Sequence, residues 1–171
     1  MARLRASARS SESTRSVVDE RVVLRSRELL ERAEALFEDA SAVEDDGAER
    51  FRLFYLAAIR ASAAVLAVHE PPGPVRRRRD ARDAWSRIKA VAPEAHDLAE
   101  YFGGLSVMRG HVEAGLVKTV DSTLCARVER RAMEFLDLAD ATLLMYEQGK
   151  MPDRRRSTGR SGGRQADLLV S

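Results

Sequence analysis

A run of four arginines, Arg76 to Arg79, is the strongest chemical signal in the chain, and Arg82 and Trp85 follow it closely. Guanidinium groups bind phosphate oxygens in a forked geometry, and a nearby indole ring can stack on a nucleic-acid base. This combination predicts an RNA-binding or nucleotide-binding edge. Its residues are Arg76, Arg77, Arg78, Arg79 and Arg82.

The same segment also has a purely structural interpretation. Arginines in a solvated loop can pair with the many acids of the preceding helices, and Trp85 can be buried as an anchor of the core. Residues 17–149 carry a net charge of −5, which favours this interpretation because a negative body repels phosphates.

The three histidines are the natural candidates for general acid or base catalysis near neutral pH. His69 falls on the bulky apolar side of a predicted helix, which indicates a buried or boundary imidazole. His96 and His111 project away from the apolar side of their predicted helix, which indicates solvated surface positions. None of the three is therefore predicted to be catalytic.

Recognisable metal, nucleotide and hydrolase motifs are missing from the sequence. Cys125 is the only cysteine, so an internal disulfide and a cysteine-rich metal site are excluded, and we expect no cofactor and no metal. Arg109 is unusual because it shares an apolar helix side with Leu105 and Val112. It could pair with an acid, extend outward along its own stem, or line a site.

Positive charge is concentrated toward the two ends of the sequence. Residues 1–16 have a net charge of +3 and residues 150–171 have +4, in polar segments rich in serine or glycine. Such blocks are typical of disorder, so we expect a disordered basic leader over 1–16 and a disordered basic tail over 150–171. Either segment could contact nucleic acid or simply aid solubility.

Length and composition predict one all-α domain over residues 17–149. The chain has 171 residues, 44% of them hydrophobic but only 5% aromatic, and it is rich in good helix formers. No stretch of eighteen apolar residues occurs, so we expect no membrane-spanning segment. A soluble, cytoplasmic protein is the expectation.

Apolar periodicity predicts the helices. One covers about 17–40, with Val18 and Leu29 on its apolar side, and the next begins at a capping box formed by Asp46 and Glu49. A short helix carries Trp85, another starts at Pro93 and continues past Val112, and the last follows Asp121 and closes near Gly149.

The helix over residues 46–69 has two apolar sides of different character. One side is bulky, and the other is a strip of mostly small residues that comprises Leu53, Ala57, Ala61, Ala64 and Val68. A helix that is apolar nearly all round must be covered on both sides. It is either the central helix of the bundle, or its small strip packs against a second copy to form a homodimer.

The order of these segments resembles the HEPN superfamily, and most closely its small actinobacterial branch. The resemblance spans roughly Val17 to Gln148 and rests on RFRLFYLAAIRASAAVLAV, a proline-rich break, and RRRRDARDAWSRIKAVAPEAHDLAEYFGG. It implies an up-and-down antiparallel bundle of four main helices plus a short extra helix, commonly a homodimer. It also implies RNA cleavage, toxin and antitoxin pairing with a protein partner, or binding of RNA or nucleotide.

HEPN ribonucleases carry an arginine followed after four to six residues by a histidine, and no histidine here satisfies that spacing. Lys89 and His96 come nearest, but lysine does not replace a planar guanidinium and Pro93 interrupts the helix between them. We therefore expect a non-catalytic, dimeric interaction or regulatory module. The alternative is a ribonuclease with a degenerate site that uses Lys89 or Arg109 with a histidine.

Overall fold

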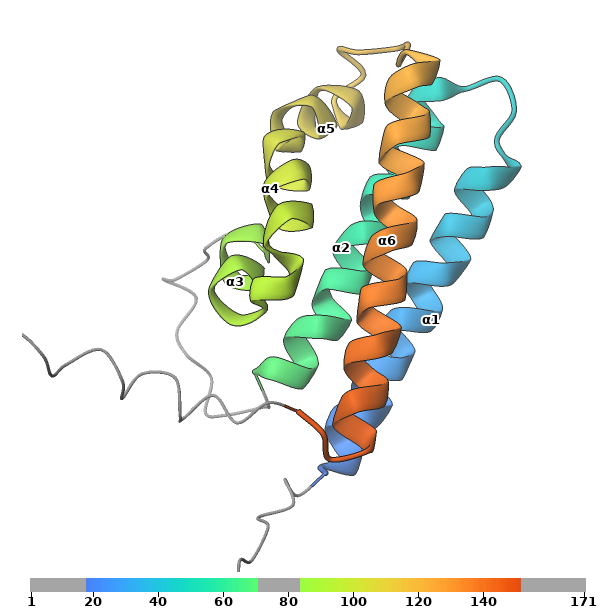
Figure 1. Cartoon of the computed structure of the whole chain (residues 1–171). Coiled ribbons are helices and arrows are strands. Elements are labelled where there is room, and N and C mark those ends of the chain that lie inside the picture. Colours follow the sequence, from blue (N-terminus) through green and yellow to red (C-terminus); the bar gives the residue numbers. More distant parts are fainter. Residues whose placement is uncertain (1–17, 71–83, 152–171) are drawn as a thin grey trace, which may run out of the picture.

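Residues 18–70 and 84–151 are the part of the chain that the computed structural model describes. Within these ranges the chain forms helices and no strand, which confirms the predicted all-α fold. The leader 1–16, nearly all of the tail 150–171 and the arginines at 76–79 and 82 lie outside the described residues. The elements are α1 (Glu20–Ala42), α2 (Gly47–His69), α3 (Ala84–Val91), η2 (Pro93–Ala95), α4 (His96–Gly104), α5 (Ser106–Glu113) and α6 (Ser122–Glu147) (Figure 1).

Aspartate side chains begin the three long helices. Asp19 accepts a hydrogen bond from the Arg21 amide at the start of α1, and Asp121 accepts from the amides of the first turn of α6. At the start of α2, the Asp46 carboxylate accepts from the Glu49 amide at 2.9 Å, which is one half of the predicted capping box, whereas the Glu49 carboxylate accepts from Arg52. These bonds satisfy amides that have no partner within their helix, so each aspartate fixes where its helix starts.

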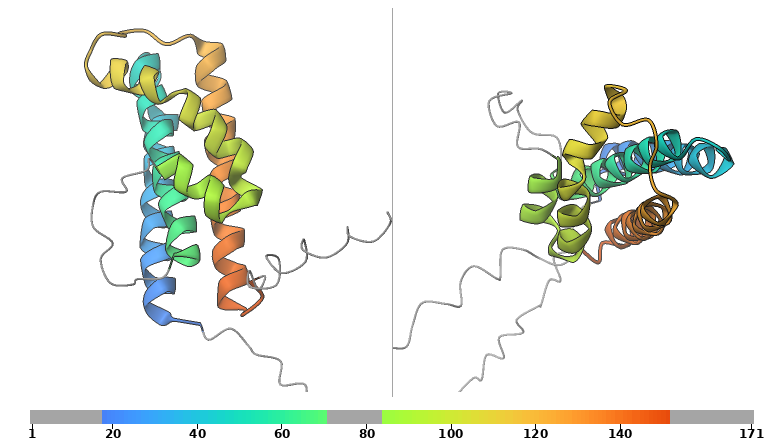
Figure 2. Two further views of the ribbon diagram at one scale, coloured as in Figure 1. Left: turned by 90° about the vertical axis from the view of Figure 1, so that its left-hand side faces the viewer. Right: turned by 90° about the horizontal axis from the view of Figure 1, so that it is seen from above.

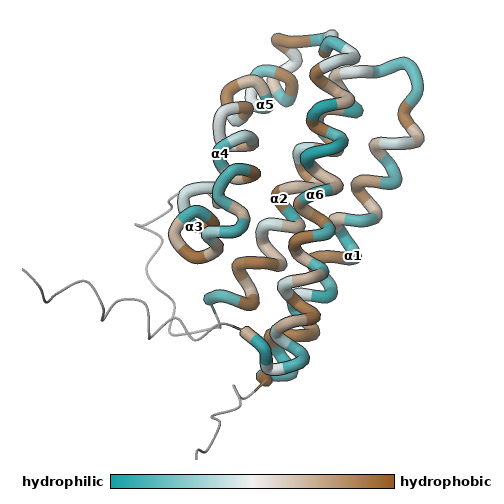
Figure 3. The backbone as a smooth tube through the Cα atoms, viewed as in Figure 1, coloured by the Kyte–Doolittle hydropathy of each residue, from teal (hydrophilic) through white to brown (hydrophobic). Residues whose placement is uncertain are grey.

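The helices form an up-and-down bundle. Figures 1 and 2 show α1 and α2 running antiparallel, α3, α4 and α5 returning beside α2, and α6 running back against α2 and α1. The fourth main segment is α4 together with α5, and α3 is the short extra helix. Hydrophilic and hydrophobic segments alternate along α1 and α6 (Figure 3), because each of these helices has a single apolar side.

Central placement of α2 is confirmed. Both of its apolar sides are buried, with Phe51, Phe54 and Tyr55 on one side and Ala57 and Ala61 on the other, each at most 1% exposed. By length and composition alone, α2 contains a mostly apolar stretch of 18 residues that could cross a membrane. However, 72% of that stretch is buried inside the bundle, as in a core helix of a soluble protein.

The alanine strip of α2 is not a surface for a second copy, so this interpretation of the strip is wrong. The Ser26 hydroxyl of α1 donates to the Ala64 carbonyl oxygen at 3.1 Å, and Val68 packs against Val22 of α1 and Leu143 of α6. Small side chains at this strip let α1 approach closely. The neighbour that the strip requires is therefore another helix of the same chain.

Two local expectations need correction. The helix that starts at Pro93 is broken at Leu105 into α4 and α5, after two glycines that weaken helical preference. Gly103 lies against α3, since a Cβ there would be 3.7 Å from the Trp85 Cβ. Val18 precedes α1 and is 38% exposed, so it does not belong to the apolar side of that helix, whereas Leu29 packs against the core as expected.

Trp85 is buried at 4% exposure in an aromatic cluster between α2, α3, α4 and α6. Its ring stacks on Phe102 with centroids 5.4 Å apart, and its Nε1 donates to the Tyr55 hydroxyl at 2.9 Å. The Tyr55 hydroxyl in turn donates to the Phe102 carbonyl oxygen at 2.9 Å. This hydroxyl therefore joins three helices through a polar contact inside the core.

We predict that Tyr55→Phe lowers the free energy of unfolding by about 1–3 kcal/mol, because the Trp85 indole loses its 2.9 Å bond to the hydroxyl and the Phe102 carbonyl loses one of its donors. Urea denaturation followed by Trp85 fluorescence measures the loss. The control is Tyr146→Phe, whose hydroxyl accepts from the exposed Asp19 amide at 3.1 Å and whose removal should cost less than about 0.5 kcal/mol. Equal losses in the two variants would contradict the central role of Tyr55.

A second prediction concerns the start of α2. A Cβ added at Gly47 would lie 2.7 Å from the Val120 carbonyl oxygen, so Gly47→Ala forces backbone apart and should destabilise the protein by about 1–3 kcal/mol. The same change at Gly110 within α5 meets nothing within 4 Å and should stabilise by about 0.5–1 kcal/mol. Urea midpoints that move in the same direction for both variants would refute this reading of the close approach.

Candidate nucleic-acid interface

The predicted interface, Arg76, Arg77, Arg78, Arg79 and Arg82, lies outside the described residues, but the structure describes both flanks of that segment. The end of α2 and the start of α3 are held together by an ion pair between Arg87 and Glu70. Arg87 is therefore engaged by a carboxylate.

Trp85 is not available to stack on a base, because its ring is enclosed by Tyr55, Phe102 and Phe135. The structural interpretation of this residue as a core anchor is confirmed. Any RNA contact near α3 must therefore use the arginines without the indole.

The histidines lie on three separate elements. The His69 side chain at the end of α2 is 7% exposed, with its Nε2 3.5 Å from a Glu94 carboxylate oxygen, which confirms a buried or boundary position. His96 is 51% exposed at the start of α4, and His111 is exposed on α5. Lys89 lies in the last turn of α3 and is separated from His96 by the turn at Pro93, so the two do not share a helix face.

Arg109 pairs with an acid and covers an aromatic ring. Its guanidinium lies 3.2 Å from a Glu113 carboxylate oxygen and 5.4 Å from the centre of the Tyr55 ring. Of the alternatives for this residue, the structure shows pairing with Glu113, one turn further along α5. The Glu113 carboxylate thus offsets the charge of Arg109, and the guanidinium packs against the aromatic cluster at Tyr55.

Three arginines on α6 form a second cationic cluster that sequence reasoning missed. Arg127, Arg130 and Arg131 follow a spacing of three and one residues, which places them on adjacent turns of the helix. Arg131 pairs with Glu134 at 2.8 Å, whereas Arg127 and Arg130 are exposed and form no ion pair with the described part of the chain. Reading the helix around residues 121–146 for charge as well as for apolar periodicity would have revealed them.

Tyr101 on α4 lies beside this α6 cluster. The Arg131 guanidinium sits 5.7 Å from its ring centre, and its hydroxyl is buried with no hydrogen-bond partner among the described residues. Burial raises the pKa of this phenol, and the positive charges of Arg127, Arg131 and Arg130 partly oppose the rise. Tyr101 is therefore neutral at pH 7 and acts as a wall of the cluster rather than as a base.

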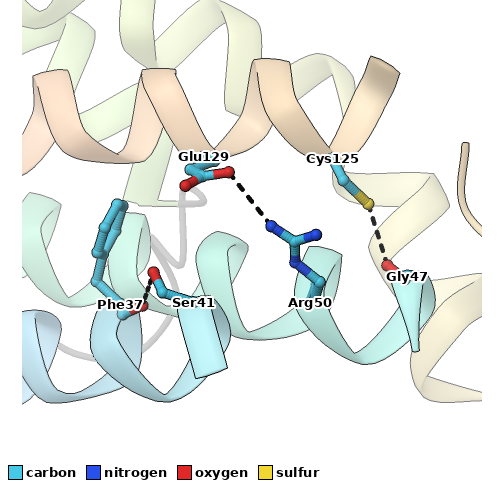
Figure 4. A network of polar contacts seen from close by, with 6 residues as sticks. All are labelled: Phe37, Ser41, Gly47, Arg50, Cys125 and Glu129. Atoms are coloured by element: carbon cyan, nitrogen blue, oxygen red, sulfur yellow. Dashed lines mark hydrogen bonds and ion pairs between the residues drawn. The ribbon is translucent and has the colours of Figure 1, made fainter. Parts of the chain in front are cut away.

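Polar contacts between α2 and α6 are structural in kind (Figure 4). Arg50 reaches Glu129 at 3.4 Å, and the Cys125 thiol donates to the Gly47 carbonyl oxygen at 3.2 Å. Burial raises the pKa of Cys125, which keeps it a thiol and makes it a poor nucleophile. In the described ranges, no group of three His, Cys, Asp or Glu side chains could hold a metal ion.

Charge is strongly divided along the chain. The described residues contain 22 acids and 15 lysines and arginines, a net charge of −7, whereas residues 1–17, 71–83 and 152–171 each carry +3. Positive charge able to meet a polyanion is therefore concentrated in the three segments outside the described helices, with the α6 arginines as an addition.

Comparison with known proteins agrees with the arrangement of the helices. A family model described as SAV_6107-like HEPN matches residues 40–140, which include α2 to α5 and most of α6 and exceed half of the chain. No curated protein and no solved structure matches. The chain therefore belongs to the SAV_6107-like HEPN family.

Proposed function

We propose that this protein is a non-catalytic, dimeric HEPN module of the cytoplasm that regulates through binding RNA or a nucleotide. The observation that carries the proposal is the concentration of arginines at 76–79 and 82 in a chain that lacks the arginine and histidine spacing of HEPN ribonucleases. Forked guanidinium groups suit phosphate, and binding needs no general base. An additional protein partner is compatible with this role.

Positions of the histidines support binding over cleavage. Ribonuclease chemistry needs a base and a phosphate-binding cation close together. Here His96 faces the carboxylates of Asp97 and Glu100 at 3.6 and 3.8 Å, and His111 belongs to a different helix. Arg109 is engaged by Glu113. The degenerate-site alternative therefore has no observation in its favour.

We predict that replacing Arg76, Arg77, Arg78 and Arg79 with Ala weakens binding to single-stranded RNA at least about tenfold at low salt. The salt slope should fall by roughly 3, because each lost phosphate contact removes about 0.7 from it. Fluorescence anisotropy with a labelled oligonucleotide at several salt concentrations measures both quantities. The same reactions, examined on a denaturing gel, should show intact RNA.

The matched control removes four exposed arginines from α1 and α2, namely Arg21, Arg25, Arg32 and Arg60, none of which forms an ion pair within the described residues. It lowers the net charge by the same amount but should reduce affinity less than the first variant. If the two variants lose affinity equally, the protein attracts RNA only through its overall charge, and the proposed interface is wrong.

Dimerisation is a separate prediction. Val107 on α5 and Leu116 after it are 69% and 74% exposed, more than any other large hydrophobic residue described. We expect light scattering at micromolar concentration to give twice the chain mass of 19.0 kDa, and Val107→Asp with Leu116→Asp to give the monomer. Leu24→Asp, at a side chain 56% exposed on α1, should leave the dimer intact. A wild-type mass of 19.0 kDa removes the dimer from the proposal.

A further inference from the structure

A groove of about 380 Å³ runs between α1 and α6, on the side of the bundle away from α3, α4 and α5. Phe37 and Leu136 line it with apolar surface, and Met133 stands at its edge, 44% exposed. An apolar lining of this kind can receive the methylene part of a long side chain.

Four carboxylates surround this lining: Glu34 and Glu38 from α1, and Asp137 and Asp140 from α6. All four are exposed, and none forms an ion pair with another described residue. Further along the same two helices, Arg27 of α1 donates from its Nε to the Glu147 carboxylate at 2.9 Å. An acid on α6 therefore pairs with an arginine on α1 where the two lie close together. The four acids of the groove have no such arginine among the described residues.

We propose that the groove binds the arginine-rich segment 154–164 of the same chain. This segment contains Arg154, Arg155, Arg156, Arg160 and Arg164, opposite in sign to the groove. Arginine suits the site because its stem can lie on the apolar lining while its guanidinium pairs with carboxylates in a forked geometry. The proposed occupant of the groove is thus a cationic peptide segment of the same chain.

The reach of the chain supports this choice. Met151 is the last described residue, and it packs against the cluster of Val22, Val68 and Leu143. Leu143 follows Asp140 by three positions, which is roughly 5 Å along α6. An extended segment covers about 3.3 Å per residue, so the residues from Arg154 to Arg156 come within reach of Asp140. The leader is a poorer match, because its arginines at 3, 5, 9 and 15 are separated, whereas the tail has three in succession.

Docking has a regulatory consequence, which rests on the proposed RNA binding although the docking itself does not. While the groove holds these arginines, they cannot contact phosphates. RNA carries a denser negative charge and would displace the segment from the groove. The groove would then act as an internal competitor that raises the RNA concentration needed for binding.

The test is limited trypsin digestion of the full chain at about 0.05 M and about 0.5 M salt, with intact mass spectrometry. Cleavage after Arg154, Arg155 and Arg156 is compared between wild type and the groove variant Glu34→Gln, Glu38→Gln, Asp137→Asn and Asp140→Asn. We expect the variant to be cleaved there roughly three- to tenfold faster at low salt, since several weak ion pairs are lost together. High salt should remove the difference.

The matched control neutralises four exposed acids away from the groove: Glu28→Gln, Asp39→Asn, Glu44→Gln and Asp45→Asn. It changes the net charge equally and should leave tail cleavage unaltered. Cleavage after Arg15 serves as an internal reference in each digest.

Equal tail cleavage in wild type and groove variant at low salt overturns the proposal. An equal increase of tail cleavage in the control variant also overturns the proposal, because it would show an effect of net charge on the protease. Faster cleavage after Arg15 instead of in the tail overturns it as well. Anisotropy with RNA is independent of this readout. If the protein binds RNA but its tail is not protected from trypsin, the docking is contradicted and the proposed function is not.

Discussion

Covering both apolar sides of α2 is the constraint on which this fold depends. Thirteen of its 23 residues are buried, on two sides of different shape. The alanine side admits α1 closely enough for the Ser26 hydroxyl to reach the α2 backbone, whereas the bulky side meets the aromatic cluster of α3 and α4. The remaining helices need only one apolar side each, and their polar sides are free to carry charge.

That division has a functional meaning. Because the core is satisfied within one chain, the outer surfaces of α1 and α6 can be acidic without loss of packing, and the described body reaches −7. The net positive charge lies outside the described helices, whereas the exposed arginines on α1, α2 and α6 belong to a body in which acids outnumber lysines and arginines. In the proposed function, the negative helical body serves folding and the positive segments serve recognition.

Much of the fold could be predicted from the sequence because local signals agreed with one another. Asp46 and Asp121 mark helix starts by a bond that depends only on neighbouring residues, and the two apolar sides of α2 follow from spacing alone. Which neighbour covers the alanine strip could not be predicted, because a helix of the same chain and a helix of a second copy present equivalent surfaces.

The candidate site was less predictable. The burial of Trp85 depends on Tyr55 and Phe102, which are distant in sequence, so a local pattern cannot distinguish a buried indole from an exposed one. The α6 arginines escaped notice because they are interleaved with acids, so local composition there looks balanced. Arg76 to Arg79 with Arg82 remain a prediction from sequence.

The start of α1 and the end of α6 lie side by side, since the Asp19 amide donates to the Tyr146 hydroxyl at 3.1 Å. Residues 1–17 and 152–171, each with a net charge of +3, are therefore tethered a short distance apart. A polyanion captured by one of them finds the other at high effective concentration, so two weak attachments can act together as one stronger attachment.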